Sequence, residues 1–123
     1  MCDSAVGIPA FEPPKMLKIS VDFDDTITAA PDLWFRLMCI MDKAGHDVRI
    51  VTARFDHPDL NLDIKTFLLG AEDSFPVIYC GGIQKAAKCS SVGWEPDIWI
   101  DDSPEVIPKP TSLVERVKEL GLV

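Results

Sequence analysis

The sequence predicts an α/β fold, a three-layer sandwich with helices on both faces of a small parallel sheet of about four to five strands. Short apolar segments typical of strands alternate four times with helical segments along the chain. Such alternation is typical of parallel sheets joined by right-handed crossovers. The chain has 123 residues, of which 47% are hydrophobic and 26% are charged. This length and composition suit one globular domain with its own core.

The elements of the first half follow from apolar periodicity. Residues 17–21 alternate with a period of two and predict the first strand, and residues 48–51 predict the second. Between them we predict a helix from Pro31 to about Ala44, because Pro31 suits a first helical turn and Gly45 suits a helix end. Its apolar residues at helical spacing are expected to face the core: Leu33, Leu37, Ile40, Met41 and Ala44.

The second half continues the alternation. A helix is predicted from Asp59 to Gly70, a strand from Phe75 to Cys80 and a short helix from Ile83 to about Ser90. The fourth strand is predicted from Asp97 to Ile100, and a last helix from Ser112 to Leu120. The helix that begins at Asp59 should face inward through Leu60, Ile64, Phe67 and Leu68.

The organisation of the chain is simple. Residues 1–15 are predicted to be an extended tail, because three prolines in this stretch disfavour a helix. Residues 16–123 are predicted to form the single domain. The chain contains four cysteines without C-x-x-C spacing, and we expect reduced thiols rather than disulfides or a zinc site. These are Cys2, Cys39, Cys80 and Cys89.

Charge and hydropathy exclude several classes of function. The net charge of −8 repels phosphate backbones, so we expect no extensive nucleic-acid binding. The same acidity suits a site that binds a divalent cation. The apolar runs are too short to cross a bilayer, and the first residues show no secretory signal. We therefore expect a cytoplasmic protein without a membrane partner.

Polar side chains cluster where three of the four predicted strands end. They are Asp22, Asp24 and Thr26 after the first, Thr52 and Arg54 after the second, and Asp101 and Asp102 after the fourth. In an open α/β sheet these ends lie together, and ligands bind in the crevice outside them. Several carboxylates in one place repel each other unless a cation neutralises them. An oxygen-ligated divalent ion, Mg2+ by preference, resolves this repulsion.

Four segments resemble the motifs of the haloacid dehalogenase (HAD) superfamily, in the order found there. Residues 21–27, V-D-F-D-D-T-I, resemble the D-x-D-x-T motif that follows a strand, although many members have glycine in place of Asp25. Residues 50–52, Lys85 and residues 98–102 resemble the remaining three motifs. The resemblance covers most of the chain, from about residue 17 to residue 108. It implies a Rossmann-like, HAD-like sandwich.

The resemblance also implies a reaction. Asp22 would be the nucleophile that attacks phosphorus and forms an aspartyl-phosphate. Asp24 would protonate the leaving oxygen and then accept a proton from the attacking water. Within the family, an acid at this second position is typical of phosphatases and phosphotransferases rather than dehalogenases.

The remaining motif residues receive roles in the same way. Thr52 would donate a hydrogen bond to a phosphoryl oxygen. Lys85 would neutralise the transferring group and hold Asp22, although Lys88, one turn later, is an alternative. Arg54 is either a surface cation or a grip on the substrate. The metal ligands would be Asp22, the backbone carbonyl of Asp24, and both Asp101 and Asp102. Which of the last two binds directly is left open.

The spacing between the motifs leaves no room for the cap domain that many family members insert over the site. The site should therefore be open, as in members that act on phosphoproteins or polynucleotide ends, and a homo-oligomer is left open. We predict a Mg2+-dependent phosphomonoester phosphatase acting on a small or macromolecular phosphorylated substrate. A nucleotide or polynucleotide substrate is one alternative, and a non-catalytic or regulatory binding module of the same fold is another. A response-regulator-like phosphoacceptor fits less well, because its acidic pair follows the first strand.

Overall fold

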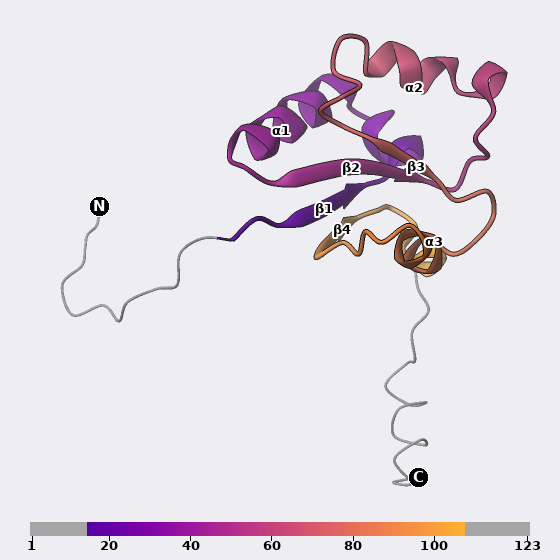
Figure 1. Cartoon of the computed structure of the whole chain (residues 1–123). Helices are drawn as coiled ribbons and strands as arrows, with labels where there is room; N and C mark the ends of the chain where they lie inside the picture. Colours follow the sequence, from indigo (N-terminus) through magenta and orange to yellow (C-terminus); the bar gives the residue numbers. More distant parts are fainter. Residues whose placement is uncertain (1–14, 108–123) are drawn as a thin grey trace, which may run out of the picture.

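The computed structural model describes residues 15–107, which form an α/β fold around a four-stranded sheet. The strands are β1 (Lys18–Val21), β2 (Asp47–Thr52), β3 (Val77–Tyr79) and β4 (Ile98–Ile100). All pairs are parallel and the strand order is β3-β2-β1-β4 (Figure 1). The predicted parallel α/β architecture is confirmed, and each predicted strand is present.

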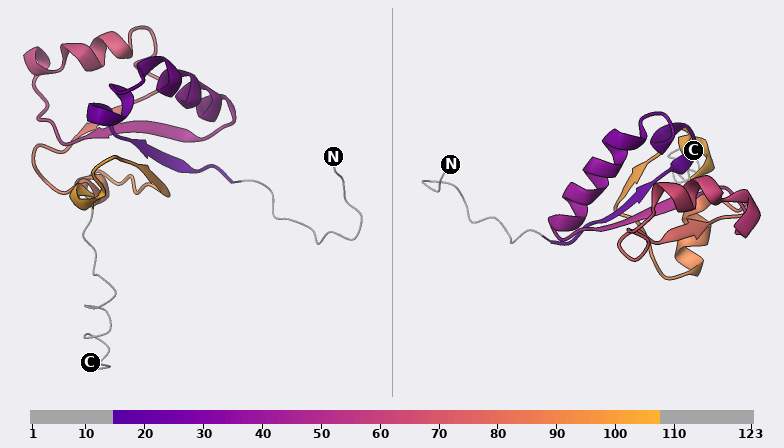
Figure 2. Two further views of the ribbon diagram at one scale, coloured as in Figure 1. Left: turned by 180° about the vertical axis from the view of Figure 1, so that it is seen from behind. Right: turned by 90° about the horizontal axis from the view of Figure 1, so that it is seen from above.

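Helices lie on both faces of the sheet. α1 (Pro31–Lys43) and α2 (Leu62–Phe67) lie on one face, and α3 (Lys85–Ser91) lies on the other (Figures 1 and 2). This arrangement follows from the strand order. The chain moves outward from β1 to β3 and then returns past β1 to β4, so the last crossover covers the opposite face.

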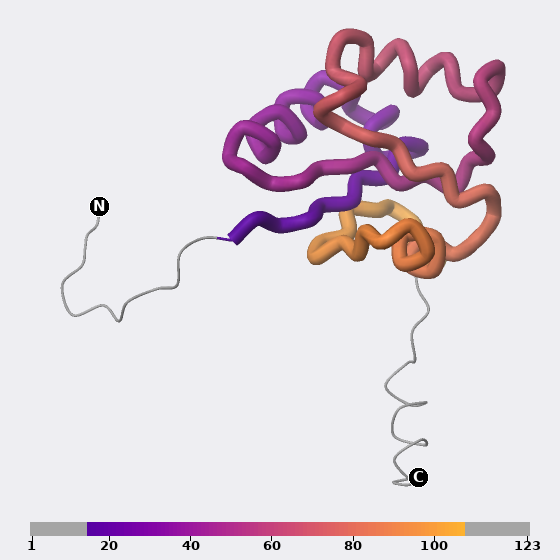
Figure 3. The backbone as a smooth tube through the Cα atoms, in the orientation of Figure 1, coloured from indigo at the N-terminus to yellow at the C-terminus, as the bar shows by residue number. Residues whose placement is uncertain are grey.

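The register between β1 and β4 determines which residues meet at the carboxyl edge of the sheet. Val21 pairs with Ile100, and the backbone N–H of Asp22 still donates to the carbonyl of Ile100 at 2.9 Å. Asp22 and Asp101 therefore leave the sheet next to each other. The segments that follow β1, β2 and β4 all start from this carboxyl edge of the sheet, as the tube in Figure 3 shows.

The core has one cluster on each face of the sheet. The larger cluster lies under α1 and α2 and includes Val21, Ile50 and Met38. The smaller cluster lies under α3 and includes Val51 and Trp94. Trp94 is 4% exposed in this cluster.

The face that α1 buries differs from the prediction. Leu33, Leu37 and Ile40 are exposed, whereas Met38 is fully buried and Trp34 packs against the core. The prediction was therefore wrong for Leu33, Leu37, Ile40 and Ala44, which are exposed, and correct for Met41, which packs against the core. Trp34 and Met38 lie one helical turn apart, on the side of α1 that packs against the core.

The second predicted helix begins later than expected. A single helical turn, Pro58–Leu60, precedes α2, and Leu60 is exposed rather than inward. The reason is Asn61, which has non-helical φ and ψ angles of −123° and 28°. Its side-chain amide donates to the carbonyls of Phe55 and His57, both at 2.9 Å, so it closes the preceding loop instead of extending a helix.

Other expectations concern single residues or termini. Cys39, Cys80 and Cys89 are free thiols, as predicted. The predicted tail and the predicted last helix, residues 112–120, lie outside the described residues. Within residues 15–107, no helix is long and apolar enough to cross a membrane.

Candidate functional site

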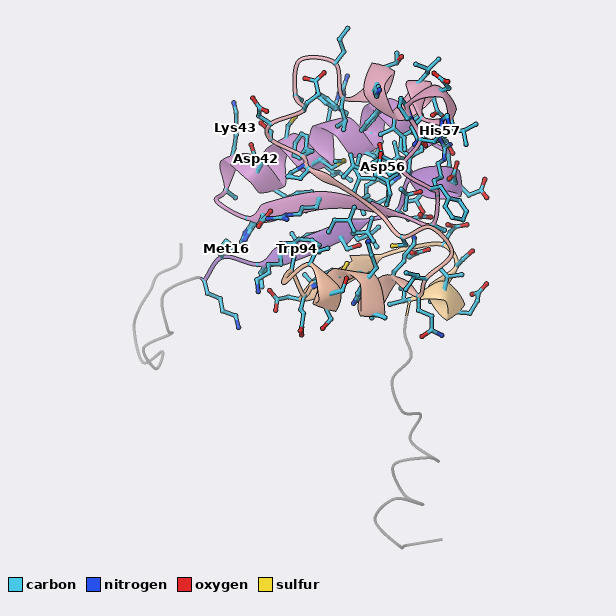
Figure 4. The ribbon with its side chains drawn as sticks, turned by 45° about the vertical axis from the view of Figure 1, so that its right-hand side comes forward. Met16, Asp42, Lys43, Asp56, His57 and Trp94 are labelled. Atoms are coloured by element: carbon cyan, nitrogen blue, oxygen red, sulfur yellow. The ribbon has the colours of Figure 1, made fainter. Side chains whose placement is uncertain are left out.

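The structure brings most of the predicted site residues together at the carboxyl edge of the sheet. Asp22 continues β1, Asp101 and Asp102 follow β4, and Lys85 begins α3. Figure 4 shows this edge on the side of Asp56 and His57, opposite Met16, Asp42 and Lys43. The residues come from three distant parts of the sequence, and the parallel sheet collects them at one edge.

A buried lysine links two of the carboxylates. The Lys85 Nζ atom donates to Asp22 Oδ1 at 2.8 Å and to Asp101 Oδ2 at 2.6 Å. Lys85 is 1% exposed and Asp22 is 7% exposed. The contact that was predicted for Lys85 toward Asp22 is therefore present, and the described contacts give none of this kind to Lys88.

A glycine turn aims Lys85 at the site. Gly81 and Gly82 have φ angles of 57° and 85°, in the left-handed region that favours glycine. A Cβ atom on Gly81 would also lie 3.2 Å from the Phe55 ring. The two glycines form the turn between β3 and α3. Lys85, the first residue of α3, then contacts Asp22 and Asp101.

Three carboxylates in this place form a potential cation site. Asp22, Asp101 and Asp102 each offer one oxygen, and these oxygens lie within 4.8 Å of one another. Asp101 is held by the backbone N–H of Ser103, which donates to Oδ1 at 2.9 Å. Asp102 accepts a hydrogen bond from Thr26 Oγ1 at 3.3 Å. Three carboxylate oxygens at this spacing are ligands of the kind that a hard divalent cation prefers.

The electrostatics of the site reflect a surplus of negative charge. The pKa of Asp22 is raised from 3.8 to about 6, mainly by burial and also by the neighbouring Asp102 and Asp101, while the hydrogen bond and the charge of Lys85 oppose this rise. Burial opposes the charged form of Lys85, but its hydrogen bonds to Asp101 and Asp22 outweigh that effect and raise its pKa. Lys85 thus stays a cation, and Asp22 is ionised at neutral pH.

Asp24 lies close to Asp22 in the sequence, and its side chain faces Arg54. Its carboxylate accepts two hydrogen bonds from Arg54, with Nε at 3.0 Å from Oδ2 and Nη2 at 2.7 Å from Oδ1. The side chain is 52% exposed. The adjoining Asp25 has a φ angle of 64°, which explains why glycine would also suit that position. The Asp24 carboxylate is therefore not one of the three carboxylates that form the potential cation site, and only its backbone carbonyl remains as a predicted ligand.

Arg54 has a partner that sequence reasoning missed. Asp63, at the start of α2, accepts from Nη1 at 2.7 Å and from Nη2 at 2.9 Å. These hydrogen bonds lower the pKa of Asp63 and raise that of Arg54. No motif singles out Asp63, because an acid in a first helical turn is common on helical grounds alone.

Thr52 and the two histidines of the chain occupy different environments. Thr52 is fully buried, and its Oγ1 accepts from the backbone N–H of Arg54 at 3.3 Å, which leaves the hydroxyl proton free to donate. His57 is exposed and accepts from the Asp59 N–H at 3.2 Å. His46 accepts from the Leu17 N–H at 3.0 Å and joins a turn to the start of β1. Both histidines have local structural contacts.

Two shallow hollows flank the buried lysine. One, of about 310 Å³, is lined by the carboxylates of Asp101 and Asp102 and by Trp34. The other, of about 300 Å³, lies beside Lys85 and is bordered by Ile83 and Val106. Both hollows are open to solvent; the first gives a ligand access to Asp101 and Asp102, and the second borders Lys85.

Comparisons with protein-family models, curated proteins and solved structures find no match to this chain. The chemistry of the site therefore has to come from its own residues. These are a buried carboxylate next to a lysine, two further carboxylates at a spacing suited to a divalent ion, and an outer carboxylate bound to an arginine.

Proposed function

We propose that this protein is a Mg2+-dependent phosphohydrolase that cleaves phosphomonoesters through an aspartyl-phosphate, with a capless site of the HAD type. One observation carries the proposal. Lys85 bridges Asp22 and Asp101, and Asp102 completes a group of oxygens within 4.8 Å. A nucleophile, a countercharge and ligands for a divalent ion thus meet at one point, in agreement with the motif resemblance of the sequence.

The first chemical step follows from these roles. An Asp22 carboxylate oxygen attacks phosphorus, and the bond between phosphorus and the ester oxygen breaks as the new P–O bond forms. Asp24 gives its proton to the departing oxygen, so the leaving group departs as an alcohol. Lys85 balances the charge of the transferred phosphoryl group, and the buried Thr52 hydroxyl donates to one of its oxygens.

The second step restores the enzyme. Water attacks the phosphorus of the aspartyl-phosphate while Asp24 accepts its proton, and the bond to Asp22 breaks to release inorganic phosphate. Mg2+ held by Asp22, Asp101, Asp102 and the Asp24 carbonyl would reduce the repulsion between carboxylate and phosphate. Nucleophilic attack, proton transfer and charge balance are assigned to side chains of the protein.

The open hollows, one beside Asp101 and Asp102 and one beside Lys85, bear on the substrate. A capless site admits a phosphorylated side chain of a protein as readily as a small ester. The net charge of −8 repels a long polynucleotide. We therefore favour a phosphorylated small molecule or protein over a polynucleotide end.

The experiment measures phosphate release from p-nitrophenyl phosphate, a panel of phosphorylated metabolites and phosphopeptides, with Mg2+ and with EDTA. Asp22→Asn should abolish release, because it removes the nucleophile while keeping the shape of the side chain. Asp42→Asn, an exposed acid at the opposite edge, is the matched control and should retain full activity. Phosphate release that persists in Asp22→Asn would contradict the assignment of Asp22 as the nucleophile. If no substrate is hydrolysed, the fold serves as a binding module instead.

A further inference from the structure

The guanidinium of Arg54 is fully occupied by groups of the protein. Nε and Nη2 donate to the two oxygens of Asp24, and Nη1 and Nη2 donate to the two oxygens of Asp63. Nη1 also faces the carbonyl of Leu60 at 3.3 Å. A guanidinium has five N–H groups, and these contacts engage all of them. In this arrangement Arg54 has no donor left for a phosphoryl oxygen.

The side of the arginine that faces Asp63 is firmly anchored. Asp63 lies in the first turn of α2, and its Oδ1 also accepts from the backbone N–H of Ile64 at 2.9 Å. Asn61, which is 1% exposed, approaches Nη1 at 3.4 Å and ties the loop between β2 and α2 together. The guanidinium carbon lies 5.1 Å from the centre of the buried Phe23 ring, so the arginine also stacks on the core.

The side that faces Asp24 has no other support of this kind. The Asp24 side chain is 52% exposed, and its only described side-chain partner is Arg54. An exposed carboxylate has several accessible rotamers, and a bidentate arginine selects one of them through its fixed fork geometry. Each Asp24 oxygen accepts one hydrogen bond and keeps a second lone pair, so the carboxyl group can still exchange a proton with a substrate.

We propose that Asp63, acting through Arg54, is a positioning residue that holds Asp24 in place for proton transfer to the leaving group. This inference rests on the proposed function and deepens it, since it assigns a role to an acid that does not touch the substrate. In this proposal Arg54 does not bind the substrate, as the sequence had allowed. It connects Asp63 on α2 to Asp24, the general acid. Misplacing a general acid costs most when the leaving group needs a proton to depart.

The test compares two substrates whose leaving groups differ in how much they need a proton to depart. An aryl ester such as p-nitrophenyl phosphate leaves readily as its anion, whereas an alkyl phosphate requires protonation. The parameter is kcat/KM, because it reports the steps up to departure of the leaving group and not the later hydrolysis of the aspartyl-phosphate. Asp63→Asn should lower kcat/KM for the alkyl ester by about 10-fold, a fraction of the ~10²–10⁴-fold span of a general acid, and change the aryl value less than about 2-fold.

The matched control is Asp59→Asn, which neutralises an exposed acid of the same loop that has no described contact with Arg54. It should leave both values unchanged. Asp63→Glu can still accept from Arg54 and should recover part of the alkyl activity. Thermal unfolding of each variant shows whether α2 stays folded.

Each result decides the matter. Equal losses on both substrates, or no loss on either, would overturn the positioning role while the proposed function stands. A wild type that hydrolyses neither ester removes the proposed function and this role with it. A selective loss on the alkyl ester in Asp63→Asn alone supports the role.

Discussion

The two edges of the sheet use the same kinds of residue in opposite ways. At the amino edge, Asp47 accepts from Arg49 Nε at 3.1 Å and from the indole N–H of Trp94 at 3.0 Å. Arg49 also stacks on the Trp94 ring at 4.8 Å. This acid has a cation of its own, and the group is closed within a few residues of β2 and one tryptophan. In this group, Asp47 is paired with a cation and an indole N–H of the protein itself.

At the carboxyl edge each cation is shared. Lys85 faces Asp22 and Asp101, and Arg54 faces two acids of its own. Asp102 has only the Thr26 hydroxyl as a described side-chain partner. The edge therefore carries more negative than positive charge. Where each carboxylate has its own cation, as at the amino edge, the group has a structural role. Where carboxylates outnumber the cations, as at the carboxyl edge, a bound cation can balance the excess negative charge.

Removing the shared lysine should have the largest effect on stability. Lys85→Met leaves Asp22 and Asp101 together without a countercharge, and breaking a buried ion pair in this way costs about 3–5 kcal/mol. Lys88→Met, on the same helix, should change the free energy of unfolding by less than about 0.5 kcal/mol. Urea unfolding without metal measures both, and Mg2+ should restore part of the loss. An equal loss of unfolding free energy in Lys85→Met and Lys88→Met would contradict the ion-pair role of Lys85.

The two edges should respond to pH with opposite signs. Because the pKa of Asp22 is raised from 3.8 to about 6 in the folded state, the folded protein binds more protons in that window. Its contribution to stability then falls as pH rises from about 4 to 6, by up to about 3 kcal/mol, in the metal-free protein. Asp22→Asn should remove this fall. A wild type with the same profile as Asp22→Asn would contradict the raised pKa.

For Asp47 the dependence of stability on pH has the opposite sign. Burial alone would raise its pKa, but the hydrogen bonds from Arg49 and Trp94 outweigh burial and lower it. Its contribution to stability is present above pH about 4 and is lost as pH falls through the lowered pKa. The difference in unfolding free energy between wild type and Asp47→Asn should therefore shrink in acid, whereas for Asp22→Asn it changes between pH 4 and 6.

The two arginines of β2 and its following loop give a matched pair. Arg54→Lys cannot make two bidentate contacts and should lower kcat/KM for an alkyl phosphate by about 10–100-fold through a loosely held Asp24. Arg49→Lys should leave turnover within about 2-fold, because its group does not reach the site. Steady-state kinetics on both variants checks this. A comparable loss in Arg49→Lys would mean that the effect is a general one on the fold.

The smallest effect is expected at the closed amino edge. Trp94→Phe removes the indole hydrogen bond to Asp47 and some buried surface, which should cost about 1–2 kcal/mol of stability. Turnover should not change. Thermal and urea unfolding beside a phosphatase assay separate the two, and a loss of activity without a loss of stability would contradict a purely structural group.

Most of the fold was predictable from the sequence because parallel sheets have a strong local signature. Alternating strands and helices predicted the four strands, and their carboxyl ends predicted where polar residues meet. The inward face of α1 was not predictable, because Leu37 and Met38 are both apolar and only their packing partners distinguish them. The late start of α2 depends on Asn61, whose contacts are with a loop rather than with its own helix.

The chain by itself determined the residue types of the site and their order. Strands that end in acids, and a lysine after a glycine turn, follow from local propensity and motif spacing. The tertiary structure alone decided that Lys85 faces both Asp22 and Asp101, and that Arg54 binds Asp24 and Asp63. The physical reason is that an ion pair depends on distance in space, and the parallel sheet brings these residues together from segments that no local pattern connects.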